Sequence, residues 1–336
     1  MTEPGFSVVG GAAVRAALAG RHAAVVEVIE RAYLTHARGE SVNPPSYFLR
    51  FPDRPSSRII ALPASVGGDE AVDGIKWISS FPGNIEHGLP RASAVLILND
   101  PATGYPYACL ESSIISATRT AASAALAADR LSRGARPRRV TFVGTGLIAR
   151  YIHEFLAATG WEFDEVGVFD LRTEFASAFL DAIGADPERS VVHPDAESAL
   201  RAADLVILAT TAAAPHVVDP AWFAHNPLVL NVSLRDLSPE VILAAHNVLD
   251  DVEHCLKADT SPHLAEQHTG SREFVDGVLA DVLRGDLVLE RDRPVVFSPF
   301  GLGVLDLAVG RFVYEHAVAS GQAVAVPDFF HELSRY

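Results

Sequence analysis

Short β-type runs and longer helical runs follow one another along the chain in an order that changes near residue 138. Residues 12–38 repeat apolar positions at helical spacing, which predicts a helix. Residues 46–99 contain four short β-rich runs separated by Pro, Gly, Asp or Asn, which predicts strands joined by turns. Residues 99–106 predict a turn, and the Ala-rich segment 112–131 predicts a long helix. The first part of the chain is therefore β-rich.

From residue 138 onward, apolar strands alternate with helices. The predicted strands are RRVTFV, EVGVFD, SVVH, DLVILATT and PLVLNVS. Apolar strands that alternate with helices of this length favour a parallel sheet covered on both faces. The last segment, VVFSPFGLGVLDLAVGRFVYEHAVASGQ, predicts a strand, a glycine-rich turn and a helix over 304–320. The pattern alone does not decide which domain this last helix joins.

The composition narrows the class of protein. A chain of 336 residues suits two domains, and 49% hydrophobic residues supply a sizeable core. The net charge of -15 disfavours a nucleic-acid partner, whose phosphates would be repelled. Cys109 and Cys255 form neither a CxxC pair nor a disulfide framework. The N-terminus lacks a basic signal region, and the longest uncharged run, 205–218, is too short to span a bilayer. We expect a cytoplasmic protein with no membrane partner.

A glycine turn follows the first strand of the alternating part. In VTFVGTGLIARY, Gly144, Gly146 and Ala149 fit the pattern G-x-G-x-x-A between a strand and a helix. This pattern allows a tight turn, close approach of the backbone to a pyrophosphate, and close packing of helix on strand. Asp170 ends the next strand, where a carboxylate can bind an adenosine ribose and repel a 2′-phosphate. NAD is therefore favoured over NADP, although Arg172 nearby could offset a phosphate's charge.

These patterns together define the expected fold class. We expect an α/β protein with a Rossmann-type doubly wound parallel sheet over 126–304, which would bind NAD. Residues 1–125 and 305–336 would form an α+β domain for substrate binding.

One lysine interrupts an uncharged strand in the first domain. Lys76, in GIKWISS, shares a strand face with Gly74 and Ile78. At an exposed edge it would be a solvated charge, whereas an inward lysine would need an anionic partner. The strand taken alone favours the solvated edge.

An arginine stands out in the following helix. Arg119 is the only charge between Glu111 and Asp129, in a helix of small and apolar residues that is expected to be buried. A buried guanidinium requires a carboxylate or phosphate, which could be a ligand or a core Asp or Glu. Arg50 and Arg91 alone would be ordinary surface charges.

Several motifs together resemble the ornithine cyclodeaminase/μ-crystallin family over nearly the whole chain. The most specific are GIK (74–76), RTAASAALA (119–127) and VGTGLIAR (143–150), and IIALPA, LNDPATGYP and VFSPFGLGVLDLA also fit. The resemblance implies a homodimer formed through the sheet of the first domain. It also implies that Lys76 faces inward, with the substrate α-carboxylate as its anion.

Further stretches resemble one branch of this family. They are SYFLRFP, GIKWISSFPGNI, PRASAVLILND, CLESSIISATRTAAS and NVSLRDLSPE. The resemblance implies NAD-dependent oxidation of N-[(2S)-2-amino-2-carboxyethyl]-L-glutamate to an imine, which hydrolyses to 2-oxoglutarate and L-2,3-diaminopropionate. The diamine would serve siderophore or peptide antibiotic biosynthesis, and a PLP-dependent synthase would supply the adduct. A substrate with three carboxylates suits a site rich in cations.

The resemblance also assigns residues. Lys76 and Arg119 would contact the substrate carboxylate as catalytic residues, and Arg50, Arg91 and Arg235 would add to the substrate site. The loop NVSLRDLSPE is shorter than in ornithine cyclodeaminases and lacks their GK pair, so the family's catalytic aspartate has no one-to-one counterpart here, and Asp236 is the nearest candidate. Either Asp236 or Lys76 could be the general base. The residues expected at the cofactor are Thr120, Gly144, Thr145, Gly146, Leu147, Ile148, Asp170, Arg172, Thr210, Ser233 and Gly301.

Other activities stay open at this point. Ornithine cyclodeaminase, alanine dehydrogenase and ketimine reductase are rivals within the family, and a nucleotide-bound binding protein without catalysis is a rival of another class. No metal is expected, because His254, His263 and His268 are irregularly spaced in a polar loop.

Overall fold

The chain folds into two compact units. The computed structural model describes residues 5–333, and its units are Met1–Arg119 with Leu302–Tyr336, and Thr120–Gly301. The first division falls inside one helix, α3 (Ser113–Ser132), directly after Arg119. The boundaries expected from the sequence, 125/126 and 304/305, lie a few residues later along the chain.

The first unit is built on a mostly antiparallel sheet. Its strand order is β16-β1-β7-β6-β5-β4-β2, and β3 also pairs with β4. The strands are β1 (Ser7–Val9), β2 (Ser41–Val42), β3 (Tyr47–Phe51), β4 (Arg54–Val66), β5 (Val72–Ser80), β6 (Ala92–Asn99), β7 (Pro106–Glu111) and β16 (Val324–Ala325). The four strands expected between 46 and 99 are β3 to β6, and β1, β2, β7 and β16 were not expected.

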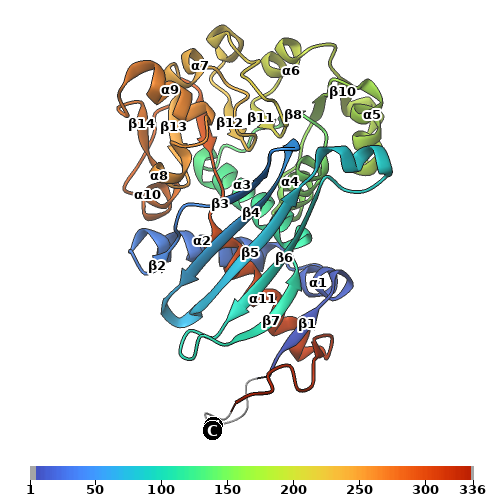
Figure 1. Ribbon diagram of the computed structural model, residues 1–336. Coiled ribbons are helices and arrows are strands. Elements are labelled where there is room, and N and C mark those ends of the chain that lie inside the picture. The colour runs from blue at the N-terminus through green and yellow to red at the C-terminus, as the bar shows by residue number, and fades with distance from the viewer. Residues whose placement is uncertain (1–4, 334–336) are drawn as a thin grey trace. The chain divides into compact units, whose positions relative to one another are not determined.

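Helices cover one face of this sheet: α1 (Gly11–Leu18), α2 (His22–Ala37) and α11 (Gly303–Ala319), with α11 running across the strands (Figure 1). Glycines permit the close approach of α11, since a Cβ on Gly310 would collide with Leu96 and one on Gly74 would lie 2.9 Å from Leu307 Cδ2. The single helix expected over 12–38 is wrong: Gly20, at φ +69°, lies in a break between two helices.

The other face of the sheet carries exposed apolar side chains. Tyr47, Ala61, Trp77 and Val95 are successive cross-strand partners on β3, β4, β5 and β6. Trp77 keeps 42% of its surface exposed and Tyr47 66%, whereas Lys76 on the opposite face keeps 2%. We call the row Tyr47, Ala61, Trp77 and Val95 the apolar row.

The second unit is a parallel sheet with helices between its strands. Its order is β10-β9-β8-β11-β12-β15-β13-β14, and every pairing is parallel. The chain winds outward from β8 in both directions, so the predicted doubly wound α/β class is confirmed. The strands are β8 (Arg139–Val143), β9 (Glu165–Phe169), β10 (Ser190–Val192), β11 (Leu205–Leu208), β12 (Leu228–Asn231), β13 (His246–Leu249), β14 (Val275–Val278) and β15 (Val295–Ser298).

The helices of the second unit are short, and several start at an acidic or hydroxyl cap. Asp195, Asp251 and Thr260 each accept a backbone N–H at a helix start. The helices are α4 (Leu147–Ala158), α5 (Thr173–Ala182), α6 (Ala196–Ala202), α7 (Pro239–Leu243), α8 (Val252–Cys255), α9 (Ser261–Thr269) and α10 (Leu279–Arg284). Buried side chains of β11, β12 and β15 and of α6 and α7 form the core.

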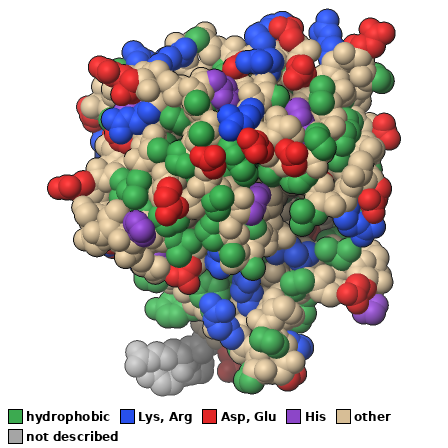
Figure 2. Space-filling model, turned by 90° about the horizontal axis from the view of Figure 1, so that it is seen from above, with side chains coloured by type: hydrophobic (Ala, Val, Ile, Leu, Met, Phe, Trp, Pro, Cys, Tyr) green, Lys and Arg blue, Asp and Glu red, His purple; other side chains and the backbone are tan. Residues whose placement is uncertain are grey.

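The surface charge is mixed. Figure 2 shows acidic and basic side chains interspersed over the face that it presents, so the net charge of -15 does not collect there in one patch. Within residues 5–333, no helix combines the length and apolarity needed to cross a membrane.

Candidate active site

A buried lysine on β5 meets an aspartate on α11. Lys76 Nζ lies 2.6 Å from Asp306 Oδ2 and 3.3 Å from Ser116 Oγ. Lys76 is 2% exposed and Asp306 is fully buried. Lys76 therefore faces inward, as the resemblance implied. Its anionic partner within the first unit is Asp306, so a substrate carboxylate would be a second anion beside it. Lys76 is also one of only two lysines in the chain.

Arg119 shares the same aspartate. Its Nε lies 3.3 Å from Asp306 Oδ1, and its side chain is 13% exposed. The buried arginine thus has a core carboxylate as its partner, the structural alternative left open by the sequence. Two cations around one carboxylate leave a formal excess of one positive charge when Lys76 is protonated. An excess charge in a buried site favours an anionic ligand beside it.

The environment of Lys76 changes its proton affinity. Burial lowers the pKa of Lys76 to about 8, Asp306 opposes this decrease, and the charge of Arg119 adds to it. An amine with a pKa near 8 exists in both protonation states close to neutrality, which suits a group that exchanges a proton during a reaction.

The sequence contained a signal for Asp306 that was not used. In FGLGVLDLAVG the aspartate is the only charge in an apolar helix start, and α11 buries almost all of this segment. The same feature singled out Arg119 in α3. Isolated charges of opposite sign in two apolar helices predict a buried pair.

Two further arginines of the first unit were singled out from the sequence, Arg50 and Arg91. Arg50 is exposed and its guanidinium lies 5.0 Å from the centre of the Phe48 ring. Arg91 donates a hydrogen bond of 2.9 Å from Nη1 to Ser80 Oγ. Among the residues described by the structure, neither Arg50 nor Arg91 forms an ion pair with a carboxylate.

The glycine turn has the shape of a dinucleotide site. Gly144 has φ +83°, and a Cβ there would lie 2.8 Å from the Ala209 carbonyl oxygen. Gly146 caps α4 and faces open space, where a pyrophosphate can approach the helix N-terminus. Ala149 is fully buried against the sheet. Leu147 and Ile148 form the first turn of α4. These residues fit the phosphates of NAD.

Asp170 lies at the end of β9 beside this turn. Its Oδ2 accepts hydrogen bonds from Thr145 N at 3.0 Å and from Thr145 Oγ1 at 2.9 Å. Arg172 donates to Glu174 at 2.7 Å and stacks on Phe175. Since Glu174 already compensates Arg172, the local charge disfavours a 2′-phosphate.

The remaining cofactor candidates lie at the carboxyl ends of strands or in α3. Thr210 follows β11, Ser233 follows β12, and Gly301 follows β15 with its N–H donating to Asp250 Oδ2 at 2.7 Å. Ligands of doubly wound sheets bind at this edge. Thr120 is half-buried in α3 directly after Arg119.

Asp236 is a buried, hydrogen-bonded residue of the second unit. It is fully buried, Oδ1 accepts a 2.6 Å hydrogen bond from Thr210 Oγ1, and Oδ2 lies 3.5 Å from His216 Nε2. His216, which the sequence did not single out, is 35% exposed. Arg235 donates to the carbonyl of Ala258 at 2.9 Å. Thr210 and Asp236 are thus brought together, whereas the guanidinium of Arg235 is bound to the backbone.

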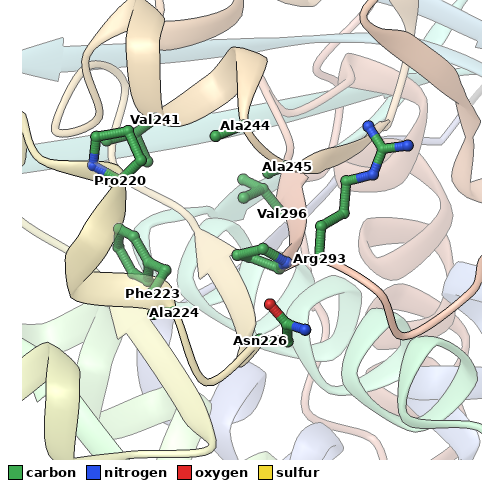
Figure 3. A pocket seen from close by; sticks show the side chains of 10 residues that line it. Pro220, Phe223, Ala224, Asn226, Val241, Ala244, Ala245, Arg293 and Val296 are labelled. Atoms are coloured by element: carbon green, nitrogen blue, oxygen red, sulfur yellow. The ribbon is translucent and has the colours of Figure 1, made fainter.

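A pocket of about 170 Å³ in the second unit lies at the opposite edge of the sheet (Figure 3). Asn226 and Pro294, which precede β12 and β15, line it together with Phe223 and Val241. Arg293 is its only charged side chain. This position at the amino ends of the strands and this apolar lining do not suit a dinucleotide.

The second unit carries a glycine turn in a doubly wound sheet, and the first unit carries a buried lysine and arginine; these are the features of a Rossmann-type oxidoreductase. Comparison with known proteins gives the family. The chain belongs to the ornithine cyclodeaminase/μ-crystallin family, whose sequence profile matches residues 13–321. The resemblance of the motifs to this family is therefore confirmed.

Three relatives illustrate the range of the family. The chain is 31% identical to the N-((2S)-2-amino-2-carboxyethyl)-L-glutamate dehydrogenase of Staphylococcus aureus, with 89% of this chain and 91% of that protein covered. The crystal structure of CmnK superposes with a TM-score of 0.88 at 31% identity, over 98% of this chain and all of CmnK. An archaeal alanine dehydrogenase dimer with bound NAD superposes with a TM-score of 0.85 at 27% identity, over 97% of this chain and all of that one.

Proposed function

We propose that this protein oxidises N-[(2S)-2-amino-2-carboxyethyl]-L-glutamate with NAD and releases 2-oxoglutarate and L-2,3-diaminopropionate. The chain belongs to a family of NAD-dependent oxidoreductases, and our proposal concerns its substrate. The observation that carries it is the buried group of Lys76, Asp306 and Arg119, whose excess positive charge suits the α-carboxylate of an amino acid. The 31% identity to the staphylococcal dehydrogenase supports the particular substrate.

The chain's own residues would bind and orient the substrate. Arg119 and Lys76 would hold the α-carboxylate of the glutamate moiety and fix the direction of its Cα–H bond. Asp306 would keep the two cations side by side, because it accepts hydrogen bonds from both. NAD, when bound, supplies the hydride acceptor. Holding the reacting carbon in one orientation is a positioning effect and requires no new charge in the site.

Lys76 is our candidate for the base. The secondary amine must lose a proton so that its lone pair can form the C=N bond as hydride leaves the Cα. Lys76, with its pKa lowered to about 8 by burial, can take that proton on Nζ. Water then adds to the imine carbon, and breaking of the C–N bond gives the keto acid and the diamine. Asp236, the other candidate base, is fully buried beside Thr210 and His216.

A product assay tests the proposal. The purified adduct is incubated with NAD and the protein, and NADH, 2-oxoglutarate and 2,3-diaminopropionate are measured together. The proposal requires equal amounts of all three. Oxidation of alanine, or cyclisation of ornithine, without turnover of the adduct would select a rival member of the family. NAD binding without turnover of any amino acid would favour the non-catalytic alternative.

We also propose a homodimer formed through the apolar row. Tyr47, Trp77 and Val95 are exposed on a sheet face whose opposite side is covered by helices. An apolar set of neighbouring side chains on a sheet face is a suitable surface for a second copy of the chain. The dimeric state named for the archaeal alanine dehydrogenase supports this arrangement.

The bond that joins the two halves of the adduct indicates the class of reaction that must supply it. The adduct joins the side-chain carbon of one amino acid to the nitrogen of glutamate, so we propose that a PLP-dependent synthase supplies it. We propose cytoplasmic activity and use of the diamine in siderophore or peptide antibiotic biosynthesis.

A further inference from the structure

A partly exposed histidine of the second unit faces a fully buried carboxylate. His216 Nε2 lies 3.5 Å from Asp236 Oδ2, and Thr210 donates to the other carboxylate oxygen, Oδ1, at 2.6 Å. Among residues 5–333, no donor completes a hydrogen bond to Oδ2. A buried carboxylate oxygen without a donor is costly, and a slightly closer approach of the His216 Nε2–H would supply one. Catalytic hydrogen bonds are often long in unliganded proteins and shorten when the ligand binds.

The backbone holds this histidine and this aspartate together. The N–H groups of His216 and Val217 both donate to the carbonyl oxygen of Asp236 at 3.0 Å, and Ser238 N donates to the carbonyl oxygen of Val217 at 2.9 Å. These bonds pair the loops that follow β11 and β12. The main chain therefore fixes the separation of the two residues, which an isolated surface histidine would not have.

Thr210 connects this pair to the glycine turn. A Cβ on Gly144 would lie 3.0 Å from Thr210 N, so Thr210 is directly beside the turn expected to bind the cofactor. The loops after β11 and β12 are at the carboxyl edge of the sheet, where doubly wound proteins bind their ligands. The side chain of His216 is partly open to solvent, and within the described chain, residues 5–333, no hydrogen bond engages its Nδ1. Nδ1 can therefore meet a small molecule at this edge.

An imidazole that donates one N–H to a carboxylate can accept a proton on its other nitrogen. The carboxylate orients the ring, selects the tautomer with hydrogen on Nε2 and stabilises the imidazolium that forms. In the proposed reaction, hydride transfer leaves an iminium carbon, and water must lose a proton as it adds there. Lys76 has by then taken the amine proton and is charged, so the second half of the reaction requires a different base.

We infer that His216 is the base that activates water for hydrolysis of the imine, and that Asp236 positions it. The inference rests on the proposed function, because the imine of that reaction is its substrate. Nδ1 of His216 takes a proton from water as the oxygen bonds to the iminium carbon and the C=N electron pair moves to nitrogen. This proton then passes from Nδ1 to that nitrogen. Nδ1 takes the remaining O–H proton as the C–N bond breaks, which gives 2-oxoglutarate and the diamine.

Trapping the imine separates its formation from its hydrolysis. In a single turnover, with the protein in excess over the adduct and NAD saturating, absorbance follows NADH and samples are quenched in sodium borodeuteride. The reagent converts the imine to Cα-deuterated adduct and 2-oxoglutarate to deuterated 2-hydroxyglutarate, and mass spectrometry measures both. His216→Gln is compared with the wild type and with His263→Gln, a control whose imidazole lies 3.6 Å from Asp259 in the same unit.

In His216→Gln, NADH should form within about threefold of the wild-type rate, whereas formation of the keto acid should slow at least about tenfold. Deuterated adduct should accumulate in this variant and stay low in the wild type and the control. Equal slowing of both steps, or unchanged hydrolysis, in a His216→Gln protein that keeps the wild-type thermal midpoint would overturn the inference. A structural role of His216 would slow both steps together.

The tautomer of His216 tests the pair without turnover. In protein labelled with ¹⁵N-histidine, the resonances that vanish in His216→Gln should show hydrogen on Nε2 of the neutral ring, and Asp236→Asn should remove this preference. Hydrogen on Nδ1 in the wild type would overturn the inference whatever the protein oxidises. If the wild type forms no NADH from the adduct, the proposed function fails instead, and the tautomer still decides whether Asp236 positions His216.

Discussion

The ammonium of Lys76 lies 2.6 Å from the carboxylate of Asp306, and both side chains are removed from solvent. A strand residue and a helix residue 230 positions apart in the chain thus form one buried ion pair. Breaking such a pair by removing one partner costs more than the pair contributes, because the remaining charge stays buried. The pair therefore connects the fold of the first unit directly to the chemistry proposed for it.

Asp306→Ala should destabilise the protein by about 3 to 5 kcal/mol, because two buried cations lose their shared carboxylate. Asp306→Asn, of nearly the same shape, should fold more stably and still lose at least about tenfold in kcat/KM. Denaturant unfolding and steady-state kinetics measure the two effects. Full activity in a folded Asp306→Asn protein would exclude a role for this carboxylate in positioning Lys76.

The pH profile should show whether Lys76 acts as a base. A base must be neutral before it accepts a proton, so kcat/KM should rise with pH until the pKa of Lys76, about 8, is passed. If Lys76 only held the carboxylate as a cation, kcat/KM would instead fall above that pH. Asp306→Asn should move the transition to lower pH, because Asp306 raises the pKa of Lys76.

The protonation state of Lys76 can be measured directly by NMR. It has only two lysines, Lys76 and Lys257, so selective ¹³C labelling of lysine gives two Cε resonances. The resonance that disappears in Lys76→Met should titrate near pH 8, while Lys257→Met removes the other and serves as the control. A Lys76 resonance that titrates above pH 10, the ordinary range of lysine, would contradict the account of its burial.

Cofactor choice should depend on the pair of Arg172 and Glu174. Glu174→Gln frees the guanidinium of Arg172, and Asp170→Ser removes the carboxylate beside the turn. The double variant should bind NADPH at least about tenfold more tightly relative to NADH than the wild type does. Fluorescence titration of both nucleotides measures the ratio, and an unchanged ratio would mean that these residues do not set the preference.

The apolar row should set the oligomeric state. Trp77→Arg places a charge in the middle of the row and should give a monomer in sedimentation velocity experiments. Leu171→Arg is the matched control, because Leu171 is 94% exposed at the end of β9 in the other unit. A dimer that survives Trp77→Arg would show that the row is not the interface.

Local patterns predicted the parts of this structure that local physics determines. The sequence pattern and composition identified the glycine turn at Gly144 and the isolated charge of Arg119. The turn precedes α4 and Arg119 lies in α3, as expected. The break at Gly20 was missed, because the helical spacing continues across it. The strands β13 and β14 were missed, because four-residue strands such as HNVL have too few positions to show a period.

Long-range partners were harder to predict. Lys76 in a strand taken alone favoured solvent, and only Asp306, brought over it by α11, accounts for its burial. Strand register places Arg50 opposite Arg58, and a single sequence does not determine register.

Turnover of the adduct by matched lysine variants tests the central claim most directly. Wild type and Lys257→Met should convert the adduct and NAD into equal amounts of NADH, 2-oxoglutarate and 2,3-diaminopropionate. Lys76→Met should retain NADH binding and lose at least about a thousandfold in kcat, since it removes both the base and a substrate contact. Near-normal turnover by Lys76→Met, or oxidation of alanine by the wild type in place of the adduct, would contradict the account.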